Sequence, residues 1–368
     1  MGSPLRILHV VVNMNRGGAE TLIMNLYRNI DRSKVQFDFL TCKEGVFDSE
    51  ILKMGGNVHR IPYISDVGHF KYVNELDHFF SANNQYKIVH SHMDKMTGLV
   101  LRSAKRAGIP IRISHSHNTS SEGGFAARVY KWYIGKYILT SATNLFACSN
   151  KAADWLFTGK SNSAKILKNG IESEKFAYSP KIRKEIREEL NLTNQFVIGH
   201  IGRFAHQKNH HFLIEIFSNF SQINNDSVLI LVGDGPLRVD IEKQVRDLNL
   251  VDKVKFVGIR SDIHRLLQAF DVLVFPSLHE GLPVSLIEAQ GAGLPCLISD
   301  NISQEVDLGC NLVDFIPLTD LKQWVQKIKG IEPIGFNRRI ASNSISIQGY
   351  DIKETAGNIE EFYLSISG

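Results

Sequence analysis

The chain has 368 residues, enough for two domains, and its 43% hydrophobic, 9% aromatic and 22% charged content excludes a fibrous or intrinsically disordered protein. The formal charge of +4 is too small for a dedicated nucleic-acid-binding protein, so we expect no nucleic-acid partner. Residues 1–170 carry 22 basic and 12 acidic side chains, and residues 171–368 carry 20 basic and 26 acidic ones. This asymmetry predicts that the first half faces an anionic partner.

The first 170 residues alternate between short apolar runs and amphipathic stretches. The runs predict strands at Ile7–Val12, Gln36–Thr41, Val58–Ile61, Ile88–His90, Ile111–Ser114 and Asn144–Cys148. The stretches predict helices at Ala19–Asn29, Tyr72–Ala82, Thr97–Ala107 and Phe125–Leu139. Strands that lack strict polar alternation and are separated by helices are typical of a parallel sheet buried on both faces.

The same pattern restarts in the second half. It predicts strands at Phe196–Ile201, Val228–Val232, Val254–Val257, Val272–Phe275 and Cys296–Ile298. It predicts helices at His211–Ser221, Leu237–Asp247 and Val284–Gly291, and a closing helix at about 354–364. Lys168-Asn169-Gly170 and the poorly patterned residues after it mark a linker, so we expect α/β domains at 1–170 and 171–349. Such sheets bind ligands beyond the carboxyl ends of their strands, which predicts a cleft between the two domains.

The first strand-to-helix turn contains paired glycines. Asn13 follows the strand, and Gly17 and Gly18 precede the helix. Glycines allow a ligand to approach the backbone, and a helix start offers N–H groups to an anion. The turn is not a dinucleotide-binding fingerprint, because the first glycine and a correctly spaced third glycine are missing. A plain tight turn and a binding loop both remain open interpretations.

Two cations follow the first strand of the second domain. Arg203 and Lys208 flank a loop that runs from Phe196–Ile201 into the next helix. Fixed cations beside a helix start suit a diphosphate, whose charge they neutralise both when it is bound and when it leaves. A solvated basic turn is the alternative interpretation.

The strongest motif follows the strand Val272–Phe275. It contains Glu280, then Gly281, Leu282, Pro283 and Val284, and then Glu288. Pro283 fits the first position of a helix, so Glu280 is expected in the loop and Glu288 inside the helix. A carboxylate, a row of N–H groups and a second carboxylate match, in order, sugar hydroxyls, a diphosphate and ribose hydroxyls. In the alternative interpretation, Glu280 is solvated and Glu288 forms an ion pair within the helix. This interpretation gives no role to Gly281 and Pro283, which lie between the two carboxylates.

Together these motifs resemble the group 1 (family 4) retaining glycosyltransferases of the GT-B fold, in particular those of bacterial exopolysaccharide and capsule synthesis. The family motifs are Gly17-Gly18-Ala19-Glu20, Gly202-Arg203 with Lys208, Gly233-Asp234-Gly235-Pro236, and Glu280 with Glu288. The segments 15–21, 115–119 and 288–296 resemble in particular the exopolysaccharide and capsule enzymes. The resemblance implies a GT-B architecture, which is two Rossmann-like α/β domains facing each other across a cleft. It also implies a C-terminal helix at 350–368 that crosses back to the first domain.

The resemblance also implies roles for the site residues. Arg203 and Lys208 would bind the donor diphosphate, and Glu288 the ribose hydroxyls. Glu280 would contact the donor sugar. The backbone at Gly281, Leu282, Pro283 and Val284 would bind phosphate, and Asn13, Gly17 and Gly18 would line the cleft from the acceptor side.

The implied activity is that of a retaining hexosyltransferase. It would move a sugar from a nucleotide diphosphate donor, a UDP-sugar being expected, to a saccharide on a polyprenyl diphosphate. Two alternatives remain open: a nucleotide-sugar epimerase on the same two-domain plan, and a non-catalytic nucleotide-sugar-binding subunit of a polysaccharide assembly. Product analysis without acceptor separates the first alternative, because only an epimerase converts the free nucleotide sugar.

Two histidine pairs, His90-x-His92 and His115-x-His117, lie at strand ends of the first domain. Strand alternation places the members of each pair on one face, which is how a metal site could begin. No acidic or cysteine ligand has a convincing spacing and no Asp-x-Asp motif occurs, so we expect no metal and no cofactor. The resemblance favours His117 as a catalytic-site residue near the donor sugar, with His92 second. His90 and His115 are expected to be buried and hydrogen-bonded.

The predicted helix Phe125–Leu139 mixes aromatic and basic side chains. This mixture suits an anionic membrane surface or a lipid diphosphate, and a half-buried helix with solvated basic residues is the alternative. No apolar run reaches the roughly 18–20 residues of a membrane span, and Ile7–Val12 is too short for a signal peptide. The four cysteines form no CxxC pair, which is typical of a reduced, intracellular protein. We therefore expect a cytoplasmic protein, with peripheral attachment to the inner membrane face as a further hypothesis.

Overall fold

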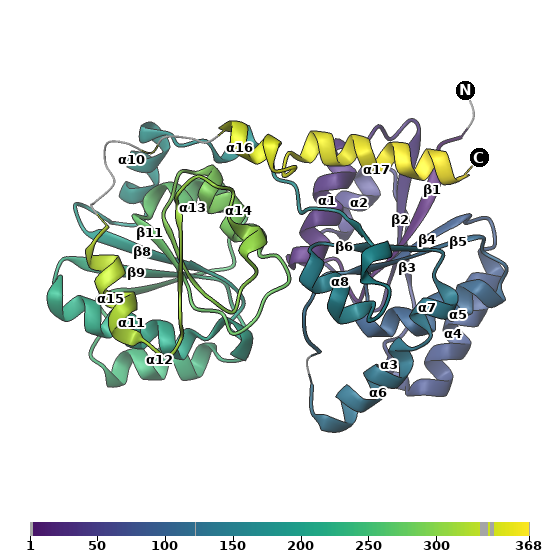
Figure 1. The fold of residues 1–368 in the computed structure, drawn as a ribbon, viewed down its shortest axis with the longest axis horizontal. Helices are drawn as coiled ribbons and strands as arrows, with labels where there is room; N and C mark the ends of the chain where they lie inside the picture. The colour runs from purple at the N-terminus through teal and green to yellow at the C-terminus, as the bar shows by residue number, and fades with distance from the viewer. Residues whose placement is uncertain (1–2, 122, 332–337, 339–341, 368) are drawn as a thin grey trace. The chain divides into compact units, whose positions relative to one another are not determined.

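The computed structural model describes residues 3–121, 123–331, 338 and 342–367. Its chain divides into two compact units, one of residues 1–170 together with 351–368 and one of residues 171–350 (Figure 1). Each unit contains one parallel β-sheet with helices packed on it. The predicted fold class, two Rossmann-like α/β domains, is therefore confirmed.

The first unit has a seven-stranded sheet in the order β3-β2-β1-β4-β5-β6-β7. Its strands are β1 (Leu5–Val10), β2 (Val35–Thr41), β3 (Val58–Arg60), β4 (Ile88–Ser91), β5 (Ile111–Ser116), β6 (Asn144–Ala147) and β7 (Lys165–Ile166). Its helices are α1 (Gly18–Asn29), α2 (Asp48–Lys53), α3 (Ile64–Val67), α4 (His69–Ala82), α5 (Thr97–Arg106), α6 (Phe125–Gly135), α7 (Ile138–Ser141), α8 (Asn150–Leu156) and α17 (Ile352–Ser367), with short 3₁₀ turns η1 (Asp94–Met96) and η2 (Ser161–Ser163). The chain order reverses between β1 and β4, and ligands of doubly wound sheets bind at such a point.

The central strands of the first unit, β1, β2, β4 and β5, are mostly buried on both faces, as their apolar runs predict. β2 is buried along its whole length, and its side chains alternate between two cores. Phe37 and Phe39 lie in the core that contains residues of α1 and α17, and Leu40 lies in the core that contains residues of α4 and α5. Such a sheet presents its backbone to ligands mainly at the strand ends.

The last helix, α17, packs on the first unit and lies beside α1 (Figure 1). Ile352, Ala356, Ile359 and Tyr363 recur at helical spacing and are all buried in the same core as α1. Gly170 fits against the start of α17, because a Cβ at Gly170 would lie 2.9 Å from the Cα of Ile352. Residue 368, the last of the predicted closing helix, lies outside the described residues.

The second unit has a six-stranded sheet in the order β10-β9-β8-β11-β12-β13. Its strands are β8 (Phe196–Ile201), β9 (Ser227–Val232), β10 (Val254–Gly258), β11 (Val272–Phe275), β12 (Cys296–Ser299) and β13 (Val313–Ile316). Its helices are α9 (Ser173–Phe176), α10 (Pro180–Glu189), α11 (His210–Ile223), α12 (Arg238–Asp247), α13 (Ile263–Ala269), α14 (Val284–Gly291), α15 (Leu321–Lys329) and α16 (Ser342–Ile347), with 3₁₀ turns η3 (His206–Lys208) and η4 (Gln304–Val306). The switch point of this sheet lies between β8 and β11.

The structure corrects three element predictions. The strands β7 and β13 were missed, because β7 has only two residues and Asp314 interrupts the short apolar run of β13. The helix predicted over Phe125–Leu139 is two helices, α6 and α7. The N–H groups of Lys136 and Tyr137 donate to carbonyls three residues earlier, which ends α6 in a tight turn. Among the described residues, no helix has both the length and the apolar character needed to cross a membrane.

Candidate functional site

Lys208 and Glu280 form an ion pair at the switch point of the second sheet. Lys208 belongs to the loop that follows β8 (residues 202–209, the β8 loop), and Glu280 to the loop that follows β11 (residues 276–283, the β11 loop). The two strands are neighbours, and Lys208 Nζ lies 2.7 Å from Glu280 Oε1. The Lys208 side chain is 16% exposed and that of Glu280 9%, so the pair is largely shielded from water. The motifs predict separate ligand contacts for these two residues, and the structure adds that the two charges face each other.

Hydrogen bonds hold the β8 and β11 loops together. The amide N–H of Leu278 donates to the Gln207 carbonyl at 2.8 Å, and the Gln207 side chain donates to the His279 carbonyl at 2.9 Å. Lys208 Nζ also lies 4.5 Å from the ring centre of Phe275, a cation–π distance. These contacts restrict the lysine before any ligand arrives. Arg203, at the start of the β8 loop, is exposed.

Glycines shape the β8 loop. Gly233, after β9, has a φ of 133°, and a Cβ there would collide with the carbonyl oxygen of Gly202. A Cβ at Gly202 would in turn lie 3.0 Å from the Lys208 side chain. The close approach of these segments explains why glycines precede Arg203 and follow β9.

We expect Gly233→Ala to lower the free energy of unfolding by about 2 kcal/mol, because it adds a steric collision to an unfavourable φ. Gly258→Ala is the matched control, since Gly258 also has a positive φ, 69°, but no atom lies within 4 Å of the added Cβ. Urea unfolding of both variants gives the difference. Equal losses would contradict the collision with Gly202.

The turn into α14 differs by one residue from the prediction. Pro283 is the N-cap rather than the first residue of the helix, and α14 begins at Val284, where the sequence pattern predicted it. Proline has no N–H, so the backbone donors in this turn come from Gly281, Leu282 and Val284. Gly281 and Leu282 are buried. The order of carboxylate, backbone turn and carboxylate is as predicted, with Glu288 inside α14.

Burial raises the pKa of Glu288 from 4.5 to about 7. The folded protein therefore keeps a proton that the unfolded chain loses between these pH values, so the stability falls as the pH rises through this window. The side chain of Glu288→Gln cannot ionise. We therefore expect the free energy of unfolding of this variant, relative to that of wild type, to be larger at pH 8 than at pH 4.5 by on the order of 2 kcal/mol. Urea unfolding at the two pH values tests this, and a difference independent of pH would contradict it.

In the first unit, the predicted glycine turn joins β1 to α1. Asn13 is half-buried, and its side chain accepts a hydrogen bond from the Asn15 amide at 3.1 Å. Gly17 is the N-cap of α1, and a Cβ at Gly17 would collide with the carboxylate of Glu20. Burial raises the pKa of Glu20 to about 7. Glu20 was not among the predicted site residues, although its carboxylate lies directly over the predicted glycine turn. Gly18, in the same turn, is exposed.

Five histidines cluster at the ends of β1, β4 and β5. His9 pairs in register with His90, and Ser91 pairs with Ser114, which brings His92 and His115 to corresponding positions. The imidazole rings are stacked or tilted against one another, with centroids 4.1 Å apart for His115 and His117, 4.4 Å for His90 and His92, and 5.2 Å for His92 and His115. The sequence predicted the faces of the four paired histidines but missed His9. No local motif marks His9, because it reaches the cluster only through the pairing of β1 with β4.

Hydrogen bonds link three of these rings in a chain. Nδ1 of His9 and Nε2 of His92 are 2.9 Å apart, and Nδ1 of His92 and Nε2 of His117 are also 2.9 Å apart. Nδ1 of His90 lies 2.7 Å from the Tyr363 hydroxyl on α17. Burial lowers the pKa of His117 and of His9 to about 3, and it lowers the pKa of His90, His92 and His115 well below 6.5. All five imidazoles are therefore neutral at pH 7.

The prediction for His115 needs correction. It is fully buried, but neither of its ring nitrogens has a hydrogen-bond partner among the described residues. His9 Nε2, His90 Nε2 and His117 Nδ1 are also buried without a partner there. Each such atom costs about 1–3 kcal/mol when no partner replaces water. The prediction that His90 is buried and hydrogen-bonded is confirmed.

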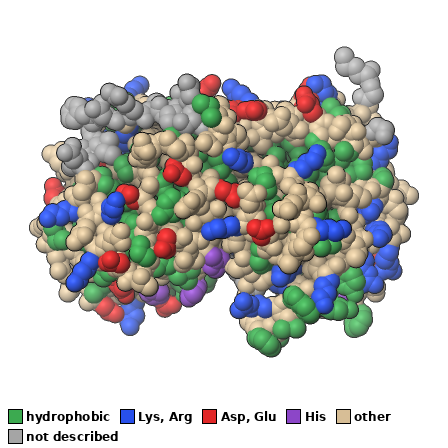
Figure 2. Space-filling model, viewed as in Figure 1, with side chains coloured by type: hydrophobic (Ala, Val, Ile, Leu, Met, Phe, Trp, Pro, Cys, Tyr) green, Lys and Arg blue, Asp and Glu red, His purple; other side chains and the backbone are tan. Residues whose placement is uncertain are grey.

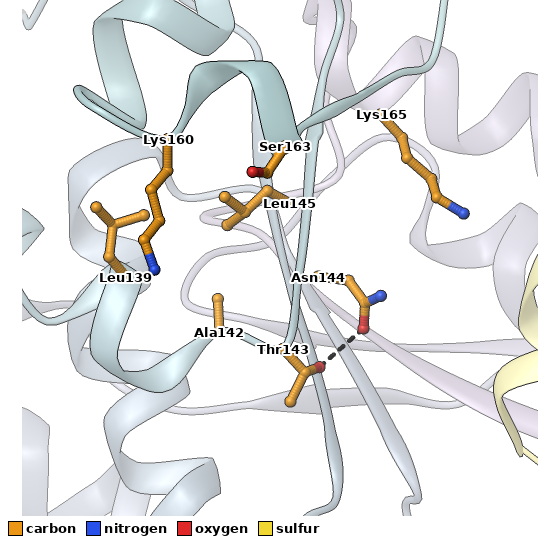
Figure 3. A pocket seen from close by; sticks show the side chains of 8 residues that line it. All are labelled: Leu139, Ala142, Thr143, Asn144, Leu145, Lys160, Ser163 and Lys165. Carbon is orange, nitrogen blue, oxygen red and sulfur yellow. Dashed lines mark hydrogen bonds between the residues drawn. The ribbon is translucent and has the colours of Figure 1, made fainter.

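A cavity of about 220 Å³ lies in another part of the first unit (Figure 3). Its walls include Thr143 and Asn144, at the amino end of β6, and Lys160. Lys165 at its margin directs its Nζ to a point 4.3 Å from the ring centre of Phe362. The carboxyl ends of the strands, which carry the predicted residues, lie at the opposite edge of the sheet, so this cavity is not the candidate site.

The predicted residues thus form two groups, one in each unit. Those of the second unit gather around the β8 and β11 loops and the start of α14. Those of the first unit gather around the β1–α1 turn and the histidine cluster. The cleft that would join the two groups stays a prediction.

Comparison with known proteins gives consistent matches to both units. The model for the glycosyl transferase 4-like domain matches residues 17–167, and the model for glycosyl transferases group 1 matches residues 182–329. A Bacillus subtilis (strain 168) protein named as a glycosyltransferase, EpsF, is 39% identical over 98% of this chain and 97% of its own. The Escherichia coli UDP-Gal:alpha-D-GlcNAc-diphosphoundecaprenol alpha-1,3-galactosyltransferase is 29% identical over 99% of this chain and 98% of its own. The crystal structure of Anabaena HepE (Alr3699) in complex with UDP-glucose has a TM-score of 0.81 at 21% identity, covering 98% of this chain and 99% of that one.

Proposed function

Because the chain belongs to the group 1 glycosyltransferases and has the GT-B fold, we propose that it transfers a hexose from a UDP-sugar to a lipid-linked saccharide, with retention of anomeric configuration. The product would be an intermediate of a bacterial exopolysaccharide or capsule. The family predicted from the sequence motifs is confirmed by the relatives, and with it the assignment as a hexosyltransferase. The donor, the acceptor and the stereochemistry are the proposed part.

The largely buried pair of Lys208 and Glu280 carries the proposal for the donor. A bound diphosphate would take Lys208 as its cation, together with Arg203 and the N–H groups at the start of α14. Glu280 would then accept hydrogen bonds from the sugar hydroxyls, and Glu288 from the ribose. When the glycosidic bond to the donor breaks, negative charge grows on the diphosphate where these cations already stand.

This arrangement supplies positive charge to the leaving group from the protein itself. We therefore propose that transfer needs no divalent metal and no cofactor at the diphosphate. In the first unit, His117 would orient the donor sugar, with Asn13, Gly17, Gly18 and His92 on the acceptor side. Activity that survives dialysis against EDTA would support this part, and activity restored only by Mg²⁺ or Mn²⁺ would contradict it.

The acceptor is proposed from the Escherichia coli relative, whose name gives a saccharide on diphosphoundecaprenol as its acceptor. Such an acceptor has a long apolar tail and stays in the membrane, so the enzyme needs a surface that approaches lipid. Helix α6 offers one on the first unit. Phe125, Val129, Trp132 and Tyr133 share a face of the helix by their spacing and are between 48% and 85% exposed.

Basic side chains accompany this apolar face. Arg128 and Lys136 are exposed on or beside α6, and Lys136 Nζ lies 3.7 Å from the Trp132 ring centre. Figure 2 shows hydrophobic and basic side chains together at the end of the first unit where Figure 1 places α6. Aromatic rings with adjacent cations suit the interface of an anionic membrane. We propose peripheral binding of α6 to the inner face of the cytoplasmic membrane.

A panel of UDP- and GDP-sugars tests the function. The donor should raise the melting temperature of the protein, and product should form only when a polyprenyl-diphosphate saccharide is added. Mass spectrometry and NMR of the product give the sugar, the linkage and the anomeric configuration. Conversion of the free nucleotide sugar without acceptor would favour an epimerase, and donor binding without transfer to any lipid acceptor would favour a non-catalytic subunit.

Flotation with liposomes tests the membrane surface. We expect the protein to float with anionic vesicles more than with neutral ones, and we expect Trp132→Glu to reduce the floating fraction severalfold because it places a charge in the apolar face. Val239→Glu is the matched control, since Val239 of α12 is 71% exposed and belongs to the second unit. Equal loss in both variants, or no preference for anionic lipid, would contradict a membrane role of α6.

A further inference from the structure

Three of the clustered histidines offer ligand atoms close enough for a shared ion. His92, His115 and His117 each provide a ring nitrogen, and these atoms lie within 4.8 Å of one another. A tetrahedral Zn²⁺ site has Zn–N bonds of about 2.0–2.1 Å, so its ligand nitrogens are about 3.4 Å apart. The three rings, now tilted against one another with centroids 4.1–5.2 Å apart, would have to turn so that these nitrogens point at one ion.

The buried nitrogens without partners point to a missing ligand. His115 is 0% exposed, and both of its ring nitrogens lack a hydrogen-bond partner among the described residues. One nitrogen of a neutral imidazole is an N–H donor and the other is an acceptor, so a buried histidine normally pairs at least one of them. A metal ion beside His92 and His117 would take the acceptor nitrogen of His115.

The neighbours of the three histidines fit the same assignment. If Nδ1 of His92 binds a metal, its Nε2 carries the hydrogen and donates to Nδ1 of His9, 2.9 Å away. The Nε2 atom of His117 faces His92. If His117 binds the metal through this atom, its Nδ1 stays available for other contacts. His117 is half-buried rather than fully buried, and it follows the carboxyl end of β5, so an ion can enter from that edge.

We propose that His92, His115 and His117 form a binding site for a divalent transition-metal ion, Zn²⁺ being the best match, with His9 as the residue that orients His92. Three histidines leave a fourth coordination position open, as in sites where water or a substrate oxygen completes the tetrahedron. The site lies entirely within the first unit. It shares His92 and His117 with the residues proposed above for the acceptor side and the donor sugar, but Zn²⁺ binding is measured without any transfer reaction, so the two proposals can fail separately.

Metal binding to the full chain, freed of any affinity tag and stripped with a chelator, tests the proposal. We expect equilibrium dialysis to give one tightly bound Zn²⁺ per chain, and Co²⁺ to give the strong visible absorption of a tetrahedral site. His115→Asn removes one ligand and should weaken Zn²⁺ binding about a hundredfold, with loss of the Co²⁺ absorption. His9→Asn should weaken binding about tenfold, because outer partners of metal-bound histidines typically contribute that much.

His78→Gln is the matched control, since His78 is an exposed histidine of α4 in the same unit, and it should bind Zn²⁺ as wild type does. Circular dichroism shows whether each variant folds, and His117→Asn replaces His115→Asn if the latter does not. The proposal is wrong if wild type binds no more Zn²⁺ than the folded ligand variants. It is equally wrong if the Co²⁺ absorption persists in them, because the ion then binds elsewhere.

Discussion

Replacing Lys208 by alanine is expected to reduce kcat by about 10²–10³-fold at saturating donor, the range found when one group that stabilises charge in a transition state is removed. The variant loses the cation nearest to the proposed diphosphate. It also leaves the carboxylate of Glu280, 9% exposed, without the Nζ that lies 2.7 Å from it. Steady-state transfer to the lipid-linked acceptor, together with donor binding, measures both effects.

Three variants sharpen the interpretation of this loss. Lys208→Arg keeps the charge and should recover part of the rate. Lys243→Ala removes a lysine that is 72% exposed in the same unit and should leave kcat unchanged. Lys208→Ala combined with Glu280→Gln measures the coupling of the pair, because two groups in contact do not contribute independently. Wild-type turnover in Lys208→Ala would remove Lys208 from the leaving-group role and the donor proposal with it.

The fold was predictable because it follows from periodicity. The alternation of apolar runs and amphipathic stretches gave both parallel sheets, and the pattern at Val284–Gly291 gave α14 with its observed bounds. Periodicity fails for elements too short to show it, such as β7 with its two residues. It also missed the break after α6, which depends on two hydrogen bonds rather than on composition.

The sites were predictable only in their local parts. The motifs place Lys208 and Glu280 on separate loops, but they lie 72 positions apart, and only the adjacency of β8 and β11 makes them a pair. His9 joins the other histidines in the same way, through strand register. A spacing rule within one motif cannot find such contacts, because they depend on which strands are neighbours and in what register they pair.

Asp271 is a further residue whose role the sequence does not reveal. It stands between Phe270 and β11 in an apolar stretch, and it is 1% exposed. Its carboxylate lies 2.6 Å from Arg183 and 3.5 Å from Arg187, both on α10, and accepts from the Val197 amide of β8 at 2.8 Å. Asp271 therefore connects α10 to the strands at the switch point. Both arginines are largely buried, with side chains 14% and 10% exposed, so the pairing takes place away from water.

We expect Asp271→Ala to lower the free energy of unfolding of the second unit by about 3–5 kcal/mol, because removing one partner leaves buried charges without compensation. Arg183 would keep its bonds to the carbonyls of α13 and Phe270 but lose its anion. Asp314→Ala is the matched control, since Asp314 pairs with Lys327 at 2.9 Å but is 50% exposed, and such pairs contribute about 1 kcal/mol or less. Urea unfolding followed by circular dichroism compares the two variants. Similar losses in both would mean that the Asp271 cluster stabilises the unit no more than a surface pair does, and that the arginines find other partners when the carboxylate is gone.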